Sequence, residues 1–464
     1  MDYDVLVLGG GIAGCCMAYE LSKYNLNIAV IERDYDVVDD ISFVNASIIY
    51  DGAEAKDDTA AFLEKEGRQL IEEACKKFNV EYNKVGSIRI ATEEKEVDKL
   101  IRMKEAADKR ELQEVYLLEP NEIKDKDDIV NDKDIKKALF CKNVSVLNPY
   151  ELAIAYGEIA ADNGVNFRFQ EEVIKIEQMS KSFKVVTNKN RFNCRVVVDT
   201  LSQKISPMND YVIRKNKNQE YMTYLMINSK EKSRFKGVVI TKIDNEALVF
   251  NIPSLREELI IAIKSSKKLN QEEALSYCKK IIKNISINDV INMFTEEYED
   301  SMIIDYNAID KGYIRLTGSN YSKMTLTPAI SKVITEVLVK NLKVKAKKEF
   351  IDKRREVYRF SKMSNKERNE IINIDNRYGN IICVCNQVSE GEIIDCIRRP
   401  LGARTVEGIR KRTGAGLGCC YGAYCSRKII KILAEEMNIN PTEVVQDEKN
   451  SKLWTNRIKE FDQV

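Results

Sequence analysis

The stretch DVLVLGGGIAG at residues 4–14 decides the fold of the amino-terminal part of this chain. Its apolar half, residues 4–8, is typical of a strand buried in a parallel sheet, and the glycines follow at once. A helical pattern comes next at residues 15–21, and a second apolar run at 28–31 ends in Glu32. The order of strand, glycine turn, helix, strand and acid predicts a dinucleotide-binding unit rather than a chance glycine-rich loop.

Each glycine of this motif has a distinct physical task. Gly9 permits the tight turn, Gly11 lets the backbone approach a pyrophosphate, and Gly14 allows the helix to pack closely on the strand. The helix N-terminus then faces the anion, and Glu32 is expected to accept hydrogen bonds from the adenosine ribose. The predicted cofactor-binding residues of the motif are Gly9, Gly11, Ile12, Ala13, Gly14 and Glu32.

The composition of the 464-residue chain is that of a globular protein with about three domains. Apolar residues make up 44% of it, and 74 basic side chains nearly balance 73 acidic ones, so nothing predicts a nucleic-acid partner. The chain has no histidine. This excludes histidine-ligated zinc and haem as well as histidine-based triads, and leaves Lys, Tyr, Cys, Asp or Glu as any acid or base.

The amino terminus and the apolar runs bear on where the protein works. No basic residue precedes the first apolar stretch, whereas a secretory signal would require one. No glycine-free apolar run is long enough to span a bilayer. We therefore expect a cytoplasmic protein without a transmembrane segment.

Six of the twelve cysteines fall between residues 383 and 425, and four of them form two pairs. Thiolates are soft ligands that select iron-sulfur clusters, zinc or Cu(I), and a 2Fe-2S cluster takes four of them, two per iron. The sequence therefore predicts a 2Fe-2S cluster on Cys383, Cys385, Cys420 and Cys425. Two alternatives stay open. One is zinc, whose paired ligands usually have two to four residues between them, and the other is a disulfide pair, which needs an oxidising compartment.

Several stretches resemble the FAD-dependent D-amino-acid oxidase superfamily, in particular its branch of glycerol-3-phosphate dehydrogenases and 2-hydroxyglutarate oxidases. The matching stretches are residues 42–47, 85–88, 148–152, 172–173 and 318–330. The resemblance spans nearly residues 1–345 and implies that the dinucleotide is FAD. It also implies that Ser42 and Asn45 lie near the isoalloxazine and that the Val173 backbone lies near the adenine. The 318–328 loop, with Gly318 and Thr325, is implied to lie near the flavin ring.

The carboxyl-terminal part resembles the 2Fe-2S domain of the bacterioferritin-associated ferredoxin type. Residues 383–393 and 412–420 carry this resemblance and bracket a helical segment. It implies that Cys420 and Cys425 are ligands, whereas Cys396 and Cys419 are not. Basic residues between the ligand pairs either favour the reduced cluster or form a solvated face or a docking patch for an acidic partner.

The expected fold class is α/β, with a Rossmann-like FAD-binding domain, an α+β substrate domain and a small helical 2Fe-2S domain. The FAD-binding domain is expected to be discontinuous and the substrate domain to fill its gaps. The predicted boundaries are 1–75, 145–205 and 302–345 for the FAD-binding domain, 76–144 and 206–301 for the substrate domain, 346–379 for a linker and 380–464 for the 2Fe-2S domain.

The departures from the family pattern gather where a substrate should bind. Tyr50 stands in the place of a histidine, and residues 294–298 read FTEEY where the family has an arginine that holds an anionic group. Lys323 replaces a glycine in the loop over the flavin. The candidate catalytic residues are therefore Tyr50, Tyr298 and Lys323, against the plainer reading of two half-buried aromatics and a surface lysine.

Together these observations predict an FAD-dependent dehydrogenase that acts on the CH–OH or CH–NH group of a small hydroxy or amino acid. Electrons are expected to leave through the cluster to a redox protein, such as a second flavoprotein subunit, or to a quinone-type acceptor. A non-catalytic electron-transfer or scaffold subunit with a degenerate substrate site is the alternative. A zinc-bound interaction module at the carboxyl terminus is a third hypothesis.

Overall fold

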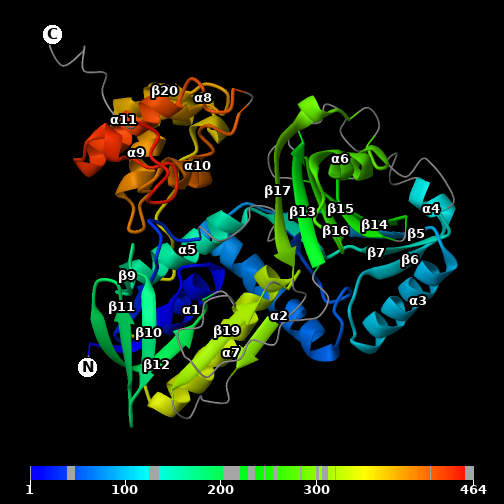
Figure 1. Ribbon diagram of the computed structural model, residues 1–464, viewed down its shortest axis with the longest axis horizontal. Coiled ribbons are helices and arrows are strands. Elements are labelled where there is room, and N and C mark those ends of the chain that lie inside the picture. Colours follow the sequence, from blue (N-terminus) through cyan, green and yellow to red (C-terminus); the bar gives the residue numbers. More distant parts are fainter. Residues whose placement is uncertain are drawn as a thin grey trace.

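The computed structural model arranges the chain as two large sheets with their helices and a carboxyl-terminal helical module (Figure 1). The module lies beside the first sheet and away from the α3 end of the second. Ser42 and Asn45 lie outside the described residues. The structure describes residues 2–38, 48–124, 135–201, 220–227, 236–244, 246–253, 259–282, 285–298, 302–305, 312–318, 320–418 and 420–454.

The first sheet is built around β1 (Tyr3–Leu8), which pairs in parallel with β2 (Ile28–Ile31) on one side and β12 (Arg191–Asp199) on the other. β1 and β2 are buried because both faces of the sheet are covered, which explains their unbroken apolar runs. The remaining strands of this eight-stranded sheet are β9 (Asn166–Arg168), β10 (Val173–Gln178), β11 (Phe183–Thr187), β18 (Met302–Asp305) and β19 (Tyr313–Gly318). Three separate parts of the chain therefore meet in one sheet.

Helices from the same three parts pack together over this sheet. α1 (Ile12–Ser22) is buried along its whole length and contacts α5 (Pro149–Asp162) and α7 (Lys323–Leu342). α2 (Asp58–Phe78) packs along α7. A helix covered on all sides needs mostly apolar residues all round, and α1 has them apart from Glu20 and Ser22, so its sequence lacks an amphipathic stripe.

The second sheet is antiparallel apart from one parallel pair, and α3 (Glu94–Lys109) and α6 (Gln271–Lys279) pack on it. A three-stranded sheet of β3 (Ile48–Ile49), β8 (Ser145–Leu147) and β4 (Tyr82–Lys84) accompanies the two large ones, and α4 (Pro120–Lys124) follows β6. In spatial order, the strands of the second sheet are β17 (Val290–Tyr298), β13 (Glu220–Ile227), β16 (Leu259–Ser265), β15 (Ala247–Pro253), β14 (Val238–Ile243), β5 (Ser87–Ala91), β7 (Lys137–Cys141) and β6 (Val115–Leu118).

The carboxyl-terminal module has a hydrophobic core of its own. It follows a connector that contains α8 (Asn365–Ile374). Its elements are β20 (Ile381–Cys383), β21 (Val388–Ser389), α9 (Glu390–Arg398), α10 (Val406–Thr413) and α11 (Ser426–Met437). The α/β fold class with a helical final module is thus confirmed, while the exact domain boundaries stay predictions.

None of the helices in the described part of the chain combines the length and the apolar character needed to cross a bilayer.

Candidate functional site

The glycine loop after β1 has the backbone geometry that the motif predicts. Gly9 has a φ of 96°, which side chains other than glycine rarely adopt. A Cβ on Gly14 would lie 1.9 Å from the carbonyl oxygen of Gly9, so the helix can pack on the loop only without a side chain there. A Cβ on Gly11 would meet nothing within 4 Å. The loop therefore leaves open space at Gly11, where a pyrophosphate needs the backbone to be accessible.

The N-terminus of α1 faces this loop. Gly11 is its N-cap, no side chain caps it, and its first turn, which includes Ile12 and Ala13, has no acidic residue. The unsatisfied N–H groups and the positive end of the helix dipole favour an anion at this position. The residues present therefore fit the phosphates of a dinucleotide.

Glu32 holds the loop from the end of β2. Its Oε2 accepts a hydrogen bond from the Gly10 N–H (2.5 Å), and its Oε1 accepts one from the Asp34 N–H (3.0 Å). The Glu171 N–H donates to the Glu32 carbonyl (2.8 Å), which brings the start of β10, and with it Val173, beside the end of β2. The ribose and adenine contacts of Glu32 and Val173 stay predictions, but the Glu171 hydrogen bond holds their two segments together although β2 and β10 are not neighbours in the strand order.

The loop between β19 and α7 meets the segment around Tyr50. Gly318 has a φ of 132°, and Thr325 is fully buried. The Thr325 Oγ1 accepts a hydrogen bond from the Tyr50 N–H (3.1 Å). A Cβ on Gly67 of α2 would lie 1.8 Å from the Thr325 carbonyl oxygen, so α2 approaches α7 closely at this level. The structure thus brings Tyr50 and Thr325 together, although 275 positions separate them.

Tyr50 packs against Tyr321, which in turn bonds a buried acid. The two rings lie edge to face with their centroids 4.8 Å apart. The Tyr321 hydroxyl donates to the Glu64 Oε1 (2.9 Å), and Glu64 is 0% exposed. The sequence predictions missed this pair. The available signal was an acid in the stripe of α2 that is otherwise small or apolar, at Ala61, Gly67, Ile71 and Ala74.

Burial changes the acidity of this region. Burial raises the pKa of Glu64 to about 7. The same cause raises the pKa of Asp51, the neighbour of Tyr50, to about 6. Carboxyl groups with pKa values near neutrality can hold or release a proton under ordinary conditions, a task for which this chain has no histidine.

We expect the pH dependence of stability to report the buried Glu64. Because its pKa is raised from 4.5 to about 7, its contribution to the free energy of unfolding falls as pH rises between those values, by about 3 kcal/mol in all. In Glu64→Gln this fall should disappear while the amide oxygen still accepts from Tyr321. Urea unfolding of both proteins at pH 5 and pH 8 measures it. An unchanged pH dependence in the variant would contradict the assignment.

The segment that lacks the family's arginine lies on β17. Phe294 pairs with Tyr224 of β13, and their rings stack with centroids 4.9 Å apart. The Tyr224 hydroxyl donates to the Glu296 Oε1 (2.9 Å). Phe294 and Tyr224 belong to the same hydrophobic cluster as Tyr50 and Tyr321. Aromatic residues, two of which donate to carboxylates, therefore pack around the segment that lacks the arginine.

The two other candidate catalytic residues, Tyr298 and Lys323, lie at the end of β17 and at the start of α7. Tyr298 ends β17 opposite Glu220, but its side chain lies outside the described part. Lys323 is the first residue of α7 and is half-buried. No side chain caps this helix at Ser322. Lys323 thus adds a positive charge at a helix N-terminus, whereas the catalytic roles of Tyr50, Tyr298 and Lys323 stay predictions.

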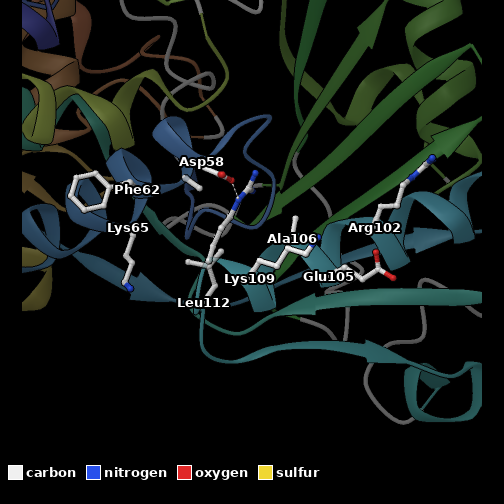
Figure 2. A pocket seen from close by; sticks show the side chains of 10 residues that line it. Asp58, Phe62, Lys65, Arg102, Glu105, Ala106, Lys109 and Leu112 are labelled. Atoms are coloured by element: carbon white, nitrogen blue, oxygen red, sulfur yellow. Dashed lines mark hydrogen bonds and ion pairs between the residues drawn. The ribbon is translucent and has the colours of Figure 1, made fainter.

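A separate groove of about 660 Å³ lies between α2 and α3 (Figure 2). It is lined by basic and acidic residues together, among them Lys65, Arg102 and Lys109. Arg110 also lines it and forms an ion pair with Asp58 (2.9 Å). No residue of the glycine loop and none of the candidate catalytic residues lines this groove, so it is not part of the site described above.

The four predicted cluster ligands come together as two pairs of thiols. Cys383 at the end of β20 contacts Cys425 before α11, and Cys385 contacts Cys420. The pairs lie near each other, because Cys420 also acts on the Cys425 thiol. Two pairs can offer two thiolates to each of two metal ions, which is the ligand set of a 2Fe-2S cluster.

The segment that precedes Cys420 approaches the Cys385 backbone closely. A Cβ on Gly418 would lie 2.2 Å from the Cβ of Cys385. The backbone N–H of Tyr424 is the main cause that lowers the pKa of the Cys420 thiol, which favours the thiolate that a metal binds. Cys396 lies apart from these four and is buried in α9, where its thiol contacts the Ile393 carbonyl.

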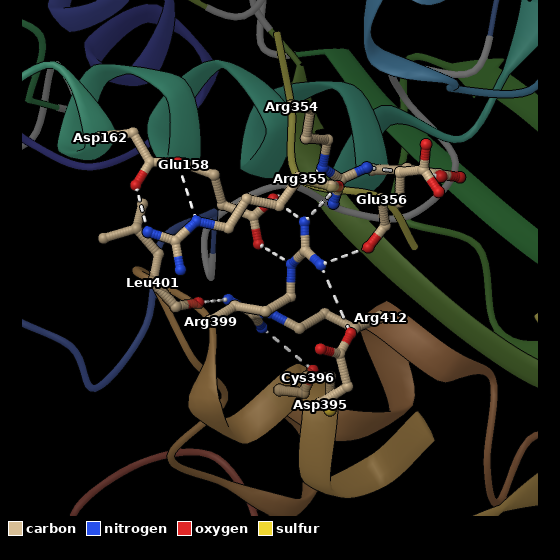
Figure 3. A network of polar contacts seen from close by, with 12 residues as sticks. Glu158, Asp162, Arg354, Arg355, Glu356, Asp395, Cys396, Arg399, Leu401 and Arg412 are labelled. Atoms are coloured by element: carbon tan, nitrogen blue, oxygen red, sulfur yellow. Dashed lines mark hydrogen bonds and ion pairs between the residues drawn. The ribbon is translucent and has the colours of Figure 1, made fainter. Parts of the chain in front are cut away.

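The carboxyl-terminal module is fixed to the first sheet by buried ion pairs (Figure 3). Glu158 of α5 bonds Arg354 of the connector (2.6 Å) and Arg399 of the module (2.7 Å). Arg412 of α10 makes a second bidentate pair with Asp36, just after β2, with one contact of 2.7 Å. The side chains of all five residues are at most 6% exposed. The cysteine-bearing module therefore docks close to the dinucleotide loop.

Two family models match the chain in the regions just described. The model described as FAD dependent oxidoreductase matches residues 4–337, and the model described as BFD-like [2Fe-2S] binding domain matches residues 381–435. Both cover the sites identified above.

The chain is also similar to individual flavin-dependent oxidoreductases. A glycerol 3-phosphate dehydrogenase from Caloramator mitchellensis is 31% identical over 98% of this chain and 99% of its own length. The mitochondrial L-2-hydroxyglutarate dehydrogenase of Pongo abelii is 25% identical over 39% of this chain and 43% of its own. The structure of the FAD-bound L-alpha-glycerophosphate oxidase from Mycoplasma pneumoniae matches with a TM-score of 0.65 at 19% identity, over 76% of this chain and 98% of that one.

Proposed function

The chain belongs to the FAD dependent oxidoreductase family and carries a BFD-like [2Fe-2S] binding domain, and we propose that it dehydrogenates a small hydroxy compound, with glycerol 3-phosphate as the first candidate. The observation that carries this proposal is the similarity to a glycerol 3-phosphate dehydrogenase over nearly the full length of both chains, the cysteine module included. The electrons then leave singly to a protein acceptor.

The cofactors supply the redox chemistry: bound FAD accepts hydride from the substrate, and the 2Fe-2S cluster transfers electrons one at a time. The accessible backbone at Gly11 and the N-terminus of α1 would hold the FAD phosphates, while Gly9 and Gly14 shape the turn. Cys383, Cys385, Cys420 and Cys425 would hold the cluster. These residue assignments are part of the proposal and follow from the open space at Gly11 and from the two thiol pairs.

The proton of the substrate hydroxyl needs an acceptor, and we assign it to the pair of Tyr321 and Glu64. The Tyr321 oxygen takes the substrate proton while its own proton passes along the 2.9 Å hydrogen bond to the Glu64 Oε1. The pKa of about 7 at Glu64 suits this exchange. Tyr50, edge to face against Tyr321, fixes the orientation of the Tyr321 ring.

Binding of the anionic group of the substrate is assigned to the amino end of α7. The segment that carries the arginine in the family has none here, and its Glu296, bonded to Tyr224, repels a phosphate or carboxylate. Lys323 and the uncapped N–H groups of α7 carry the opposite sign. We therefore expect the anionic end of the substrate to point toward α7 and away from β17.

Anaerobic reduction tests the reaction. The holoenzyme is mixed with glycerol 3-phosphate, 2-hydroxyglutarate, sarcosine or proline, and the flavin absorbance is followed. We expect bleaching by one of the two hydroxy compounds. Bleaching by an amine alone would replace the proposed alcohol chemistry with CH–NH oxidation. Indifference to all four would favour the non-catalytic electron-transfer subunit.

Removal of single cysteines tests the cluster ligands. Cys425→Ala is expected to abolish the visible absorption and the reduced-state EPR signal of the cluster, because one iron loses a thiolate. Cys396→Ala is the matched control: it also removes a buried thiol of the module, but one that contacts a carbonyl, and should keep both signals. Iron and sulfide analysis after anaerobic purification quantifies the difference. Equal cluster content in the two variants would contradict the assignment.

A further inference from the structure

The two thiol pairs of the module differ sharply in their exposure. Cys383 and Cys425 are each 1% exposed and belong to the module's core, whereas Cys385 is exposed and Cys420 is partly exposed. A metal centre held by the four thiols therefore has an inner side against the core and an outer side at the surface. Electron transfer to another protein needs close approach, which only the outer side offers.

Large apolar side chains surround this outer side. Val384 is 76% exposed, Tyr421 is 59% exposed and Tyr424 is 80% exposed. We call these three residues and Cys385 the rim patch. Exposed aromatic residues clustered around one point are typical of protein interfaces, where they act as anchors.

The backbone of Tyr421 gives a second, independent observation. It has a φ of 50°, in the left-handed region that favours glycine, and the residue after it, Gly422, has a φ of 82°. A tyrosine there is strained, and because its side chain is exposed it gains little packing in return. Glycine would suit the turn better, so the stability of the module does not account for this tyrosine.

A basic face lies next to the rim patch, on the first two turns of α11. Arg427, Lys428 and Lys431 are all exposed there, while the acidic Glu435 and Glu436 lie in the opposite end of the helix. Cations near a helix N-terminus oppose the helix dipole, so this placement weakens rather than supports the helix. Its charge would attract an acidic partner toward the rim patch.

From these observations we propose that the rim patch and the basic start of α11 are the docking site of an acidic one-electron carrier protein. This inference rests on the proposed function and names its acceptor class. The balance is simple: one substrate loses two electrons and two protons, two carriers each gain one electron, and the two protons are released to solvent. The aromatic residues supply contact area at the outer thiol pair, and the basic residues steer the carrier.

The test separates docking from catalysis by loading the electrons chemically. The holoenzyme is reduced with stoichiometric dithionite and mixed in a stopped-flow instrument with rubredoxin, an acidic one-electron carrier whose visible colour bleaches on reduction. Cytochrome c, a basic carrier, serves as the comparison. We expect the rate with rubredoxin to fall as ionic strength rises. At low salt the rate with cytochrome c should be lower than the rate with rubredoxin, and it should not fall as ionic strength rises.

Two variants, each with a matched control, locate the site. Tyr421→Gly should reduce the rubredoxin rate about tenfold, while its unfolding temperature stays equal or rises because the strain is relieved. Ile374→Ser, which removes a side chain that is 85% exposed on α8, should change neither. Lys428→Glu should slow the reaction and weaken its salt dependence. Lys366→Glu, which also changes an exposed lysine on a helix, should leave the rate and its salt dependence unchanged.

Binding of oxidised rubredoxin to the oxidised protein, measured by calorimetry, gives a readout that needs no electron transfer. A weaker affinity in Tyr421→Gly with unchanged cluster absorbance supports the proposal. Equal rubredoxin rates in Tyr421→Gly and Ile374→Ser would overturn it. So would a wild-type protein that is dimeric in solution and becomes monomeric in Tyr421→Gly, because the patch would then be a contact between two copies of this chain. If no substrate bleaches the flavin but the dithionite-loaded protein still shows these patch effects, the proposed reaction fails and the docking site stands.

Discussion

Replacement of Gly14 by alanine is expected to destabilise the whole FAD-binding unit. The added Cβ would lie 1.9 Å from the Gly9 carbonyl oxygen, which is backbone and cannot rotate away. Either α1 moves off the loop or the loop opens, and α1 is buried along its entire length. We expect a loss of at least about 3 kcal/mol in the free energy of unfolding, a large part of the stability of an ordinary domain.

Gly11 offers a matched control in the same loop. A Cβ there meets nothing within 4 Å, and the backbone is extended, with φ −69° and ψ −174°, so alanine fits without strain. Gly11→Ala should therefore unfold like the wild type but bind FAD at least about tenfold more weakly, because the methyl group occupies the approach of the pyrophosphate. Thermal unfolding of the flavin-free proteins and flavin titration separate the two effects. Full FAD affinity in Gly11→Ala would place the pyrophosphate elsewhere.

Glu158→Gln is expected to loosen the carboxyl-terminal module. Glu158 pairs with both Arg354 and Arg399, and all three side chains are at most 6% exposed. Without the shared carboxylate, Arg354 keeps only its longer contact with Glu151 (3.6 Å). Arg399 likewise keeps only its contact with Asp395 (3.4 Å). We expect a cost of about 3 kcal/mol, the lower end for a broken buried pair. We expect a separate early transition in thermal unfolding and faster protease cleavage within residues 346–379.

Asp162 provides the control for this change, because it lies one turn further along α5 and pairs with Arg355, which is 60% exposed. Asp162→Asn should change stability by no more than about 1 kcal/mol, as surface ion pairs do. If both variants behaved alike, the buried network would not hold the module. In Glu158→Gln, the delay between reduction of the flavin and reduction of the cluster should also be longer than in the wild type. The reason is that the module no longer has a fixed place beside the FAD site.

The same network should make the module sensitive to acid. Burial by itself raises the pKa of Glu158, but Arg354 and Arg399 outweigh burial and hold the pKa below its usual value. A carboxyl group with a lowered pKa contributes stability above its unfolded pKa, and this contribution is lost as pH falls through the folded pKa. Undocking of the module should therefore occur at acidic pH, in the direction opposite to the effect of Glu64.

What the sequence alone determined is local. The glycines at 9, 11 and 14 and the flanking apolar runs predict the β1–α1–β2 unit because the turn, the close packing and the anion site all depend on residues a few positions apart. The four cysteines likewise predict a 2Fe-2S cluster through their ligand chemistry and spacing. These predictions needed no knowledge of which distant segments meet.

Only the tertiary structure decided which distant groups share a buried environment. Tyr321 and Glu64 are 257 positions apart, and Glu158 and Arg399 are 241 apart, so no local pattern links them. The acidity of Glu64 and the docking of the module arise from desolvation and from partners that folding brings together. Burial and long-range pairing are properties of the folded chain, whereas turn geometry and ligand type are determined by residues that are neighbours in the sequence.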